Sequence, residues 1–425
     1  MKIRVRNSSL KGELRIPPSK SHTIRAICLA ALSKGTSVIH HPLKSEDTLA
    51  CLAAVQKLGA KLEDTGDTWK ITGFAGKPII PESPIDLKNS GTSMNFLIAI
   101  AALGEGEIEL TGDESLCRRP VQHLLDAVHL LGASRAESLN NNGKPPVIIR
   151  GRMNGGSATI EGETSQWVSA LLMTAPLMRK GIDLKVVRFN ERPYVDMTLG
   201  WLKKMGISFT RQGRNNFEVP GGQSYFGFES AIPGDFSTAT FPLIGALLCK
   251  DSSLLIKGLD MKDTQGDKRV FDIVKEMGGN IVNESGALRV SSSPVEGFEI
   301  DLNEIPDSLP AFAVLGCVAE GETRLVRVSH ARIKETDRIK VMHQELSKMG
   351  AKIEEKRDGL RIKQSALTGA EVSGHGDHRV VMALTLAGMV ADGETIIDTA
   401  ESVAVTYPGF VESMKSLGAD IEMID

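Results

Sequence analysis

The chain has 425 residues, of which 41% are hydrophobic and 24% are charged, as in a globular protein of two or three domains. Its 50 Lys and Arg residues nearly balance 53 Asp and Glu residues, and the net charge of −3 argues against nucleic-acid binding through bulk positive charge. The first residues lack the apolar core of a signal peptide, and no charge-free apolar run reaches the ~20 residues that cross a bilayer. Five scattered cysteines without CxxC spacing disfavour a disulfide framework and a zinc ribbon. We therefore expect a cytoplasmic protein that binds neither nucleic acid nor membrane.

One local pattern recurs six times along the chain. An amphipathic segment ends in Leu or Met, a glycine follows, and a short strand-like run comes next. Glycine suits the left-handed position that ends a helix. Helices and strands therefore alternate in units too long for a solenoid repeat, which predicts an α+β subdomain duplicated six times. The spacing is compatible with one ring of six units or with two groups of three. The six glycines lie 68 to 74 residues apart, at Gly59, Gly132, Gly206, Gly278, Gly350 and Gly418.

The first polar cluster follows a predicted strand that two prolines end. Ser19, Lys20, Ser21 and Arg25 lie at the start of an apolar helical run that continues to Leu32. Free N–H groups and the positive end of the helix dipole lie at such a start, so added cations are favourable when an anion binds there. A serine cap followed by solvated basic side chains is the alternative interpretation.

Two further clusters precede predicted helices in the first third of the chain. Residues 87–97 carry the flexible polar run Asn-Ser-Gly-Thr-Ser, whose N–H groups and hydroxyls suit a phosphate or carboxylate, although a plain capped helix fits equally well. Residues 111–120 place Arg118 and Arg119 ahead of a helix that begins near Pro120. Neighbouring arginines are usually solvated, and phosphate recognition is the second interpretation.

Four more clusters follow the same plan. Residues 163–167 and 232–243 place polar side chains ahead of apolar helices, and Asp235 in the second is interpreted as a helix cap. Residues 331–342 alternate cations and carboxylates, but their spacing does not give the i,i+4 ion pairs of an exposed helix. Residues 374–388 place Asp, His and Arg before an apolar helix. The HExxH spacing of a zinc site is missing.

Seven polar clusters at predicted helix starts therefore repeat one physical device. Gathered together, they would form a positive cleft in a chain whose net charge is close to zero. The sequence thus predicts a small, highly anionic set of ligands. The Walker A pattern and the GxGxxG fingerprint are both absent, so nucleotide binding through those loops is not supported.

An ordered set of motifs covers nearly the whole chain and resembles the 5-enolpyruvylshikimate-3-phosphate synthase (3-phosphoshikimate 1-carboxyvinyltransferase) family. The motifs are PPSKSHTIR, NSGTSM, LTGDESLCRRP, TSQWVSALLMTAPL, RPYVDMTL, PGDFSTATF, IPDSLPAFA, IKETDRI, GDHRVVMAL and TYPGF. The resemblance implies an α/β fold of two similar domains, each of three βαβαββ units, with the active site in the interdomain cleft. The implied domains are residues 1–18 plus 234–425, and residues 19–233.

The resemblance also implies the reaction. The enolpyruvyl group of phosphoenolpyruvate is transferred to the 5-hydroxyl of shikimate 3-phosphate by addition and elimination, releasing phosphate, without metal or cofactor and in a monomer. Catalytic roles fall to Lys20, Asp307, Glu335 and His378. Phosphoenolpyruvate would be bound by Lys20, Gly91, Thr92, Arg119, Gln166, Arg338 and Arg379. The acceptor would be bound by Ser21, Arg25, Thr164, Ser165, Gln166, Tyr194, Asp307 and Lys334.

Three positions depart from the family's pattern. The family usually has Arg where this chain has Asn95, Lys where it has Val405, and Ser where it has Glu191. A hydrogen bond to a charged group contributes about 1.5–3 kcal/mol, so each lost cation is expected to weaken phosphoenolpyruvate binding about 10- to 100-fold. The carboxylate of Glu191 would repel the acceptor's phosphate.

These departures keep other interpretations open. A family transferase with a different acceptor is one alternative, and a non-catalytic anion-binding paralogue is another. A sister family acts on UDP-N-acetylglucosamine. It normally has Lys-Asn where this chain has Lys20 and Ser21, and its loop cysteine has a different spacing from Cys117, so the sequence disfavours it.

Overall fold

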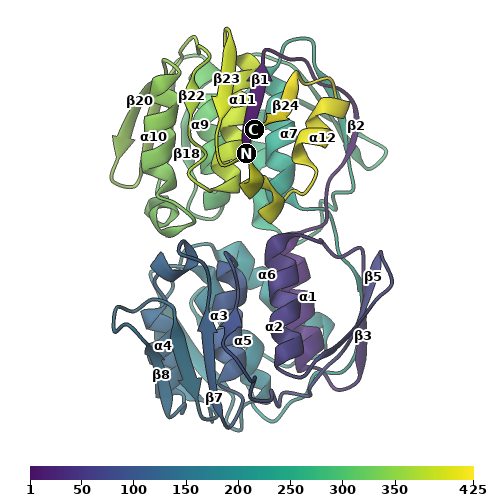
Figure 1. Ribbon diagram of the computed structural model, residues 1–425, viewed down its shortest axis with the longest axis vertical. Helices are drawn as coiled ribbons and strands as arrows, with labels where there is room; N and C mark the ends of the chain where they lie inside the picture. Colours follow the sequence, from purple (N-terminus) through teal and green to yellow (C-terminus); the bar gives the residue numbers. More distant parts are fainter. The chain divides into compact units, whose positions relative to one another are not determined.

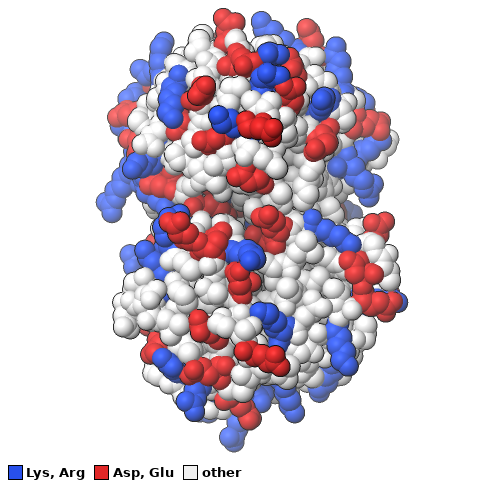
Figure 2. Space-filling model, viewed as in Figure 1, with Lys and Arg blue, Asp and Glu red and all other residues white.

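The computed structural model describes residues 1–425, and the chain divides into two compact units (Figure 1). Unit 1 consists of Met1–Pro17 and Pro233–Asp425, and unit 2 is the continuous segment Pro18–Ile232. Each unit has its own buried apolar core, as its own set of helices and sheets requires. Lys and Arg side chains are interspersed with Asp and Glu on the visible face of both units (Figure 2). None of the helices combines the length and the apolar composition that crossing a bilayer demands.

Unit 2 contains three four-stranded sheets, in which neighbouring strands pair in the following order. The first is β14 (Glu229–Ala231), β3 (Thr36–His40), β5 (Thr68–Thr72) and β4 (Lys61–Asp64). The second is β6 (Ile85–Asp86), β7 (Glu107–Thr111), β9 (Val147–Arg150) and β8 (Arg135–Ser138). The third is β10 (Gly156–Glu161), β11 (Ile182–Val187), β13 (Asn216–Val219) and β12 (Thr210–Gln212).

Unit 1 also contains three four-stranded sheets. The first is β16 (Asn280–Glu284), β17 (Ala287–Ser291), β15 (Ser253–Lys257) and β2 (Lys11–Arg15). The second is β18 (Glu299–Asp301), β19 (Glu322–Val326), β21 (Gly359–Lys363) and β20 (Lys352–Lys356). The third is β22 (Glu371–Val372), β23 (Glu394–Ile397), β1 (Lys2–Arg6) and β24 (Ile421–Ile424).

All six sheets share one pattern of pairing, with one parallel pair and two antiparallel pairs. In three sheets the four strands come from one continuous βαβαββ segment: β6–β9, β10–β13 and β18–β21. In the other three, one strand comes from a distant part of the chain, namely β14, β2 or β1. The mixed α/β fold and the sixfold repeat predicted from the sequence are therefore confirmed.

Each repeat contributes one inner helix and one outer helix. The inner helices are buried around almost their whole circumference: α1 (Lys20–Leu32), α3 (Gly91–Ala101), α5 (Ser165–Thr174), α7 (Phe236–Leu248), α9 (Leu309–Val318) and α11 (His378–Val390). The outer helices bury only one face: α2 (Glu46–Lys57), α4 (Gln122–Leu130), α6 (Arg192–Lys204), α8 (Arg269–Glu276), α10 (Arg338–Lys348) and α12 (Phe410–Ser416). An all-round apolar helix belongs in a core, and an amphipathic helix covers it.

The six repeat glycines all adopt the left-handed conformation predicted for them, with φ between 71° and 119°. Gly206 follows the end of α6, and its amide donates to the carbonyl of Lys203. A residue with a side chain is strained at such an angle, whereas a glycine is not.

We expect Gly206→Ala to lower the free energy of unfolding by about 1 kcal/mol, because alanine disfavours the left-handed region by ~1–2 kcal/mol. A Cβ at this position would have no heavy atom within 4 Å, so the loss arises from the backbone and not from a clash. Gly206→Asn is the matched variant and should lose less, since asparagine tolerates this conformation. Urea unfolding of the three proteins measures the difference. Equal losses for Ala and Asn would contradict the conformational explanation.

Candidate functional site

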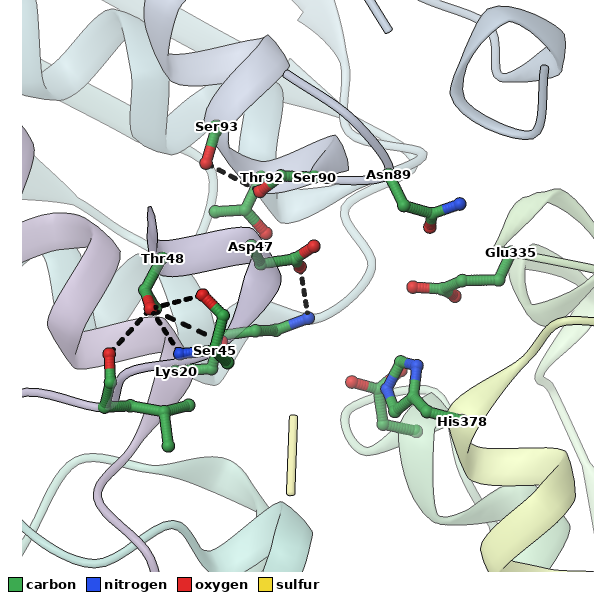
Figure 3. A network of polar contacts seen from close by, with 12 residues as sticks. Lys20, Ser45, Asp47, Thr48, Asn89, Ser90, Thr92, Ser93, Glu335 and His378 are labelled. Carbon is green, nitrogen blue, oxygen red and sulfur yellow. Dashed lines mark hydrogen bonds and ion pairs between the residues drawn. The ribbon is translucent and has the colours of Figure 1, made fainter. Parts of the chain in front are cut away.

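In unit 2, Lys20 and Ser21 open the inner helix α1, as the sequence predicts. Ser19 caps this helix by accepting a hydrogen bond from the His22 amide. The Nζ atom of Lys20 lies 2.8 Å from Oδ2 of Asp47, at the start of α2, and both side chains are largely buried (Figure 3). The other oxygen of Asp47 is buried and has no hydrogen-bond partner. Sequence reasoning missed Asp47, because an acidic residue in the first turn of a helix is ordinary.

The start of α3 brings together Gly91 and Arg119, two residues predicted to bind phosphoenolpyruvate. Nη2 of Arg119 donates to Oδ1 of Asn89 at 2.5 Å and to Oγ of Ser115 at 3.3 Å. A Cβ on Gly91 would lie 2.7 Å from Nη1 of Arg119, so the guanidinium can approach this backbone only because residue 91 is glycine. Arg118, by contrast, is exposed and pairs with Glu114.

A chain of amides joins α3 to α5. Nε2 of Gln166 donates to Oγ1 of Thr92 at 3.1 Å, which brings together two further predicted site residues. Nδ2 of Asn95 donates to Oε1 of Gln166 at 2.7 Å and to the Gly91 carbonyl at 2.9 Å, so Asn95 fixes the orientation of the Gln166 amide. Oδ1 of Asn95 is buried and has no hydrogen-bond partner. A buried acceptor of this kind is suited to a donor on a ligand.

The start of α5 is occupied by the carboxylate of Glu191. Thr164 caps this helix, and Oε2 of Glu191 accepts hydrogen bonds from the Ser165 amide at 3.1 Å and the Ser165 hydroxyl at 2.8 Å. The Thr164 hydroxyl donates to the same oxygen at 3.2 Å. Glu191 therefore contacts two residues that the resemblance assigns to the acceptor.

Arg25 is 1% exposed, and its guanidinium bonds to protein atoms. It donates to the carbonyls of Ser21 at 3.1 Å and Tyr194 at 2.9 Å and to the Thr198 hydroxyl at 2.9 Å. The guanidinium also lies over the Phe96 ring, 5.2 Å from its centre. Burial lowers the pKa of Arg25 to about 10. Arg25 thus ties α1 to α6 and fixes the backbone at two predicted acceptor residues, and direct binding of the acceptor by Arg25 stays a prediction.

In unit 1, Arg338 lies at the centre of three carboxylates. This first residue of α10 is 1% exposed, and its guanidinium lies 2.7 Å from oxygens of Asp307, Glu335 and Asp377. Burial alone would lower the pKa of Arg338, but the three carboxylates outweigh burial and raise it above its ordinary value. Asp377, which the sequence places before an apolar helix without assigning it a role in the site, caps α11 by accepting from the Arg379 amide. Arg338 therefore holds two carboxylates with predicted catalytic roles, Asp307 and Glu335, and the start of α11 in one network.

Asp307 brings three of the predicted cations together. It lies in a short 3₁₀ helix (Pro306–Ser308) before α9, and its two oxygens bind Arg338 at 2.7 Å and Arg379 at 3.0 Å. Burial would raise the pKa of Asp307, but Arg379, Lys334 and Arg338 together hold it well below its usual range. The carboxylate keeps 21% of its side-chain surface exposed, so it remains reachable.

Glu335, a member of this network, and His378 lie at the starts of two neighbouring helices of unit 1. Glu335 precedes α10 and His378 opens α11, and their side chains extend in the same direction from these elements (Figure 3). Nδ1 of His378 lies 3.9 Å from Oδ1 of Asp377. Val405, where the family usually has Lys, is buried at the end of a short 3₁₀ helix (Ala400–Val405).

Three comparisons agree on one family. The model of EPSP synthase (3-phosphoshikimate 1-carboxyvinyltransferase) matches residues 5–414. The chain is 48% identical to a 3-phosphoshikimate 1-carboxyvinyltransferase of Acetivibrio thermocellus over 99% of both chains, and 46% identical to one of Ruminiclostridium cellulolyticum over 100% of both. A solved structure of EPSP synthase from Acinetobacter baumannii superimposes with a TM-score of 0.83 at 27% identity and covers 99% of both chains.

The arginine pairs of Asp307 predict a pH-dependent stability. Because its pKa in the folded protein is lowered, Asp307 contributes stability above the ordinary pKa of about 4 and loses it as the pH falls toward the lowered value. We expect Asp307→Asn to be less stable than the parent protein at pH 7, with a gap that narrows below about pH 4. Urea unfolding at several pH values measures this gap. A gap independent of pH would show that the ion pairs contribute no stability.

Proposed function

The chain belongs to the EPSP synthase family, and we propose that it transfers the enolpyruvyl group of phosphoenolpyruvate to the 5-hydroxyl of shikimate 3-phosphate and releases phosphate. This is a step of the shikimate pathway to the aromatic amino acids. The observation that carries the proposal is the identity of 46–48% with two transferases of this name over practically the whole chain. The site geometry supports it, because Lys20, Arg338 and Arg379 lie in the first turns of α1, α10 and α11.

Both substrates are phosphorylated carboxylates, and their charges require donors of the kind that these helix starts offer. Phosphoenolpyruvate is assigned to residues that combine cations with donors at helix starts: Lys20, Gly91, Thr92, Arg119, Gln166, Arg338 and Arg379. The acceptor is assigned to residues at the starts of α1, α5 and α6 and to the groups around Asp307: Ser21, Arg25, Thr164, Ser165, Gln166, Tyr194, Asp307 and Lys334.

The reaction is an addition followed by an elimination. The acceptor's hydroxyl oxygen bonds to C2 of phosphoenolpyruvate while C3 takes up a proton, and the hydroxyl proton passes to a base. Loss of a proton from C3 then expels phosphate from C2 and restores the double bond. We assign the hydroxyl proton to Asp307 and the C3 proton to Glu335, with Lys20 and His378 beside the reacting groups. A positioned acid or base contributes about 10²- to 10⁴-fold to the rate.

The ion pairs of Asp307 give this assignment a physical condition. A carboxylate held by Arg338 and Arg379 is a weak base, because its pKa lies well below the usual range. If the anionic groups of phosphoenolpyruvate engage these arginines, their attraction for Asp307 weakens and its pKa rises toward the ordinary value. Binding of one substrate would then activate the base that acts on the other.

A family transferase with another acceptor is the second candidate, favoured by the carboxylate of Glu191 at Thr164 and Ser165. Release of phosphate from phosphoenolpyruvate with shikimate 3-phosphate decides between the two. We expect turnover above about 1 s⁻¹ and a product heavier than the acceptor by the enolpyruvyl group. Release only with a different acceptor would support the second candidate. Tight anion binding without any release would indicate a non-catalytic paralogue.

We expect Asp307→Asn to lower kcat by about 10²- to 10⁴-fold, because the amide cannot take up the hydroxyl proton. Calorimetric Kd values for both substrates should change less than about tenfold. The matched control is Asp301→Asn, which removes a carboxylate of the same unit that pairs with the exposed Arg327. The control should leave kcat unchanged. Unchanged kcat in Asp307→Asn would remove Asp307 from the mechanism.

A further inference from the structure

The carboxylate of Glu191 is bound as a ligand would be. It is 2% exposed, and one of its oxygens accepts from the amide of Ser165, the hydroxyl of Ser165 and the hydroxyl of Thr164 at 2.8–3.2 Å. Burying a charge is unfavourable unless hydrogen bonds compensate it. The compensation comes from two hydroxyls and an N–H group at the start of α5. The start of α5 therefore binds an anion in this structure, and that anion belongs to the protein.

The backbone before α6 carries Glu191 to this position. Glu191 has φ 52° and ψ 36°, in the left-handed region, and it stands immediately before the first residue of α6. Nδ2 of Asn190 donates to the carbonyl of Glu163 at 3.3 Å, which fixes the loop before α6 against the loop before α5. The side chain of Glu191 makes no capping bond to its own helix and turns to α5 instead. One carboxylate thus sits where two helix starts meet.

The donors that hold Glu191 are the same two residues that the proposed function assigns to the acceptor. A phosphate group is a strong acceptor for hydroxyl and N–H donors at a helix start. The Ser165 amide has one hydrogen and cannot serve two anions, and two anions side by side repel each other. Asn95, which binds the Gln166 amide in the first turn of the same helix, retains a buried carbonyl oxygen without a partner. That oxygen independently indicates that a ligand with donor groups binds beside α5.

We propose that Glu191 is a specificity-determining residue, an internal anion that competes with the phosphate of the acceptor for Thr164 and Ser165. The inference rests on the proposed function, which assigns these two residues to the acceptor. The carboxylate of Glu191 must leave its three donors before the phosphate of shikimate 3-phosphate can take them. Shikimate, which has a carboxylate and hydroxyls but no phosphate, does not meet this competition. The chain therefore discriminates less between the two acceptors than it would without Glu191.

Direct binding measurements test this competition. Glu191→Ser removes the carboxylate and adds a hydroxyl donor, whereas Glu191→Gln keeps the shape and removes the charge. We expect Glu191→Ser to lower the Kd for shikimate 3-phosphate about tenfold by calorimetry, and Glu191→Gln to lower it less. The Kd for shikimate should change less than about twofold. The control Glu163→Gln removes a charge from the neighbouring loop and should leave both constants unchanged.

Several results would overturn the inference. A higher or unchanged Kd for shikimate 3-phosphate in the serine variant would show that Glu191 supports the site and does not compete there. An equal decrease in the Kd for shikimate would show that Glu191 does not compete with the phosphate group. Circular dichroism checks that each variant is folded, and if the serine variant is not, a glutamine variant with no gain overturns the inference.

The outcome is separable from that of the proposed function. Turnover of the parent protein with shikimate 3-phosphate tests the function alone. If the parent protein turns over but the Glu191 variants bind shikimate 3-phosphate no more tightly, only the proposed role of Glu191 is wrong. If Glu191→Ser binds shikimate 3-phosphate more tightly but the parent protein shows no turnover, only the proposed reaction is wrong.

Discussion

A helix that is buried around its whole circumference can offer only its ends to a ligand. Six inner helices of this kind form the cores of the two units, and their side chains are committed to packing. Free N–H groups at a helix start must be satisfied, and they favour negative charge. The residues of the candidate site accordingly stand at helix starts, including Lys20 on α1, Gly91 on α3, Ser165 on α5 and His378 on α11.

The helix starts also explain why so many charges are buried in pairs. Lys20 is paired with Asp47, and Arg338 is paired with three carboxylates. An isolated buried charge would be unfavourable by several kcal/mol, so each cation that serves an anionic ligand needs a protein partner as well. Ligand binding is then an exchange of partners more than a filling of vacant positions. The two carboxylates would take different parts in this exchange. Asp307 would be released from its arginines and become a stronger base, whereas Glu191 would be displaced from its donors by the acceptor.

The repeat and the helix starts could be predicted from the sequence because both are local. A glycine at the end of each amphipathic segment marks a left-handed residue, and all six have the expected φ. The motifs likewise placed Lys20 at the start of α1 and Asp235 at the start of α7, where Asp235 accepts from the Thr238 amide. In each case the signal lies within a few residues of the feature that it predicts.

The contacts that could not be predicted join segments far apart in the chain. No local motif indicates that the guanidinium of Arg25 bonds to Thr198 and Tyr194, more than 160 residues away. Asp47 gave no signal, because only the packing of α1 on α2 brings it to Lys20. The sequence marks residue 191 as a departure from the family's pattern, but the orientation of the Glu191 side chain depends on a left-handed backbone that no short motif encodes for a glutamate.

The sheet β22-β23-β1-β24 joins the two ends of the chain and thereby imposes an order on biosynthesis. Strand β1 pairs with β23 on one side and with β24 on the other, and β24 ends at Ile424. Domains generally fold as they leave the ribosome, and unit 2 is continuous, so its last strand, β14, can join β3 once Ala231 has emerged. Strand β2 can pair with β15 soon after unit 2 has emerged, whereas β1 must wait for β23 and β24, which lie far along the chain. The continuous unit 2 can therefore complete its sheets before the sheet that contains β1 is complete.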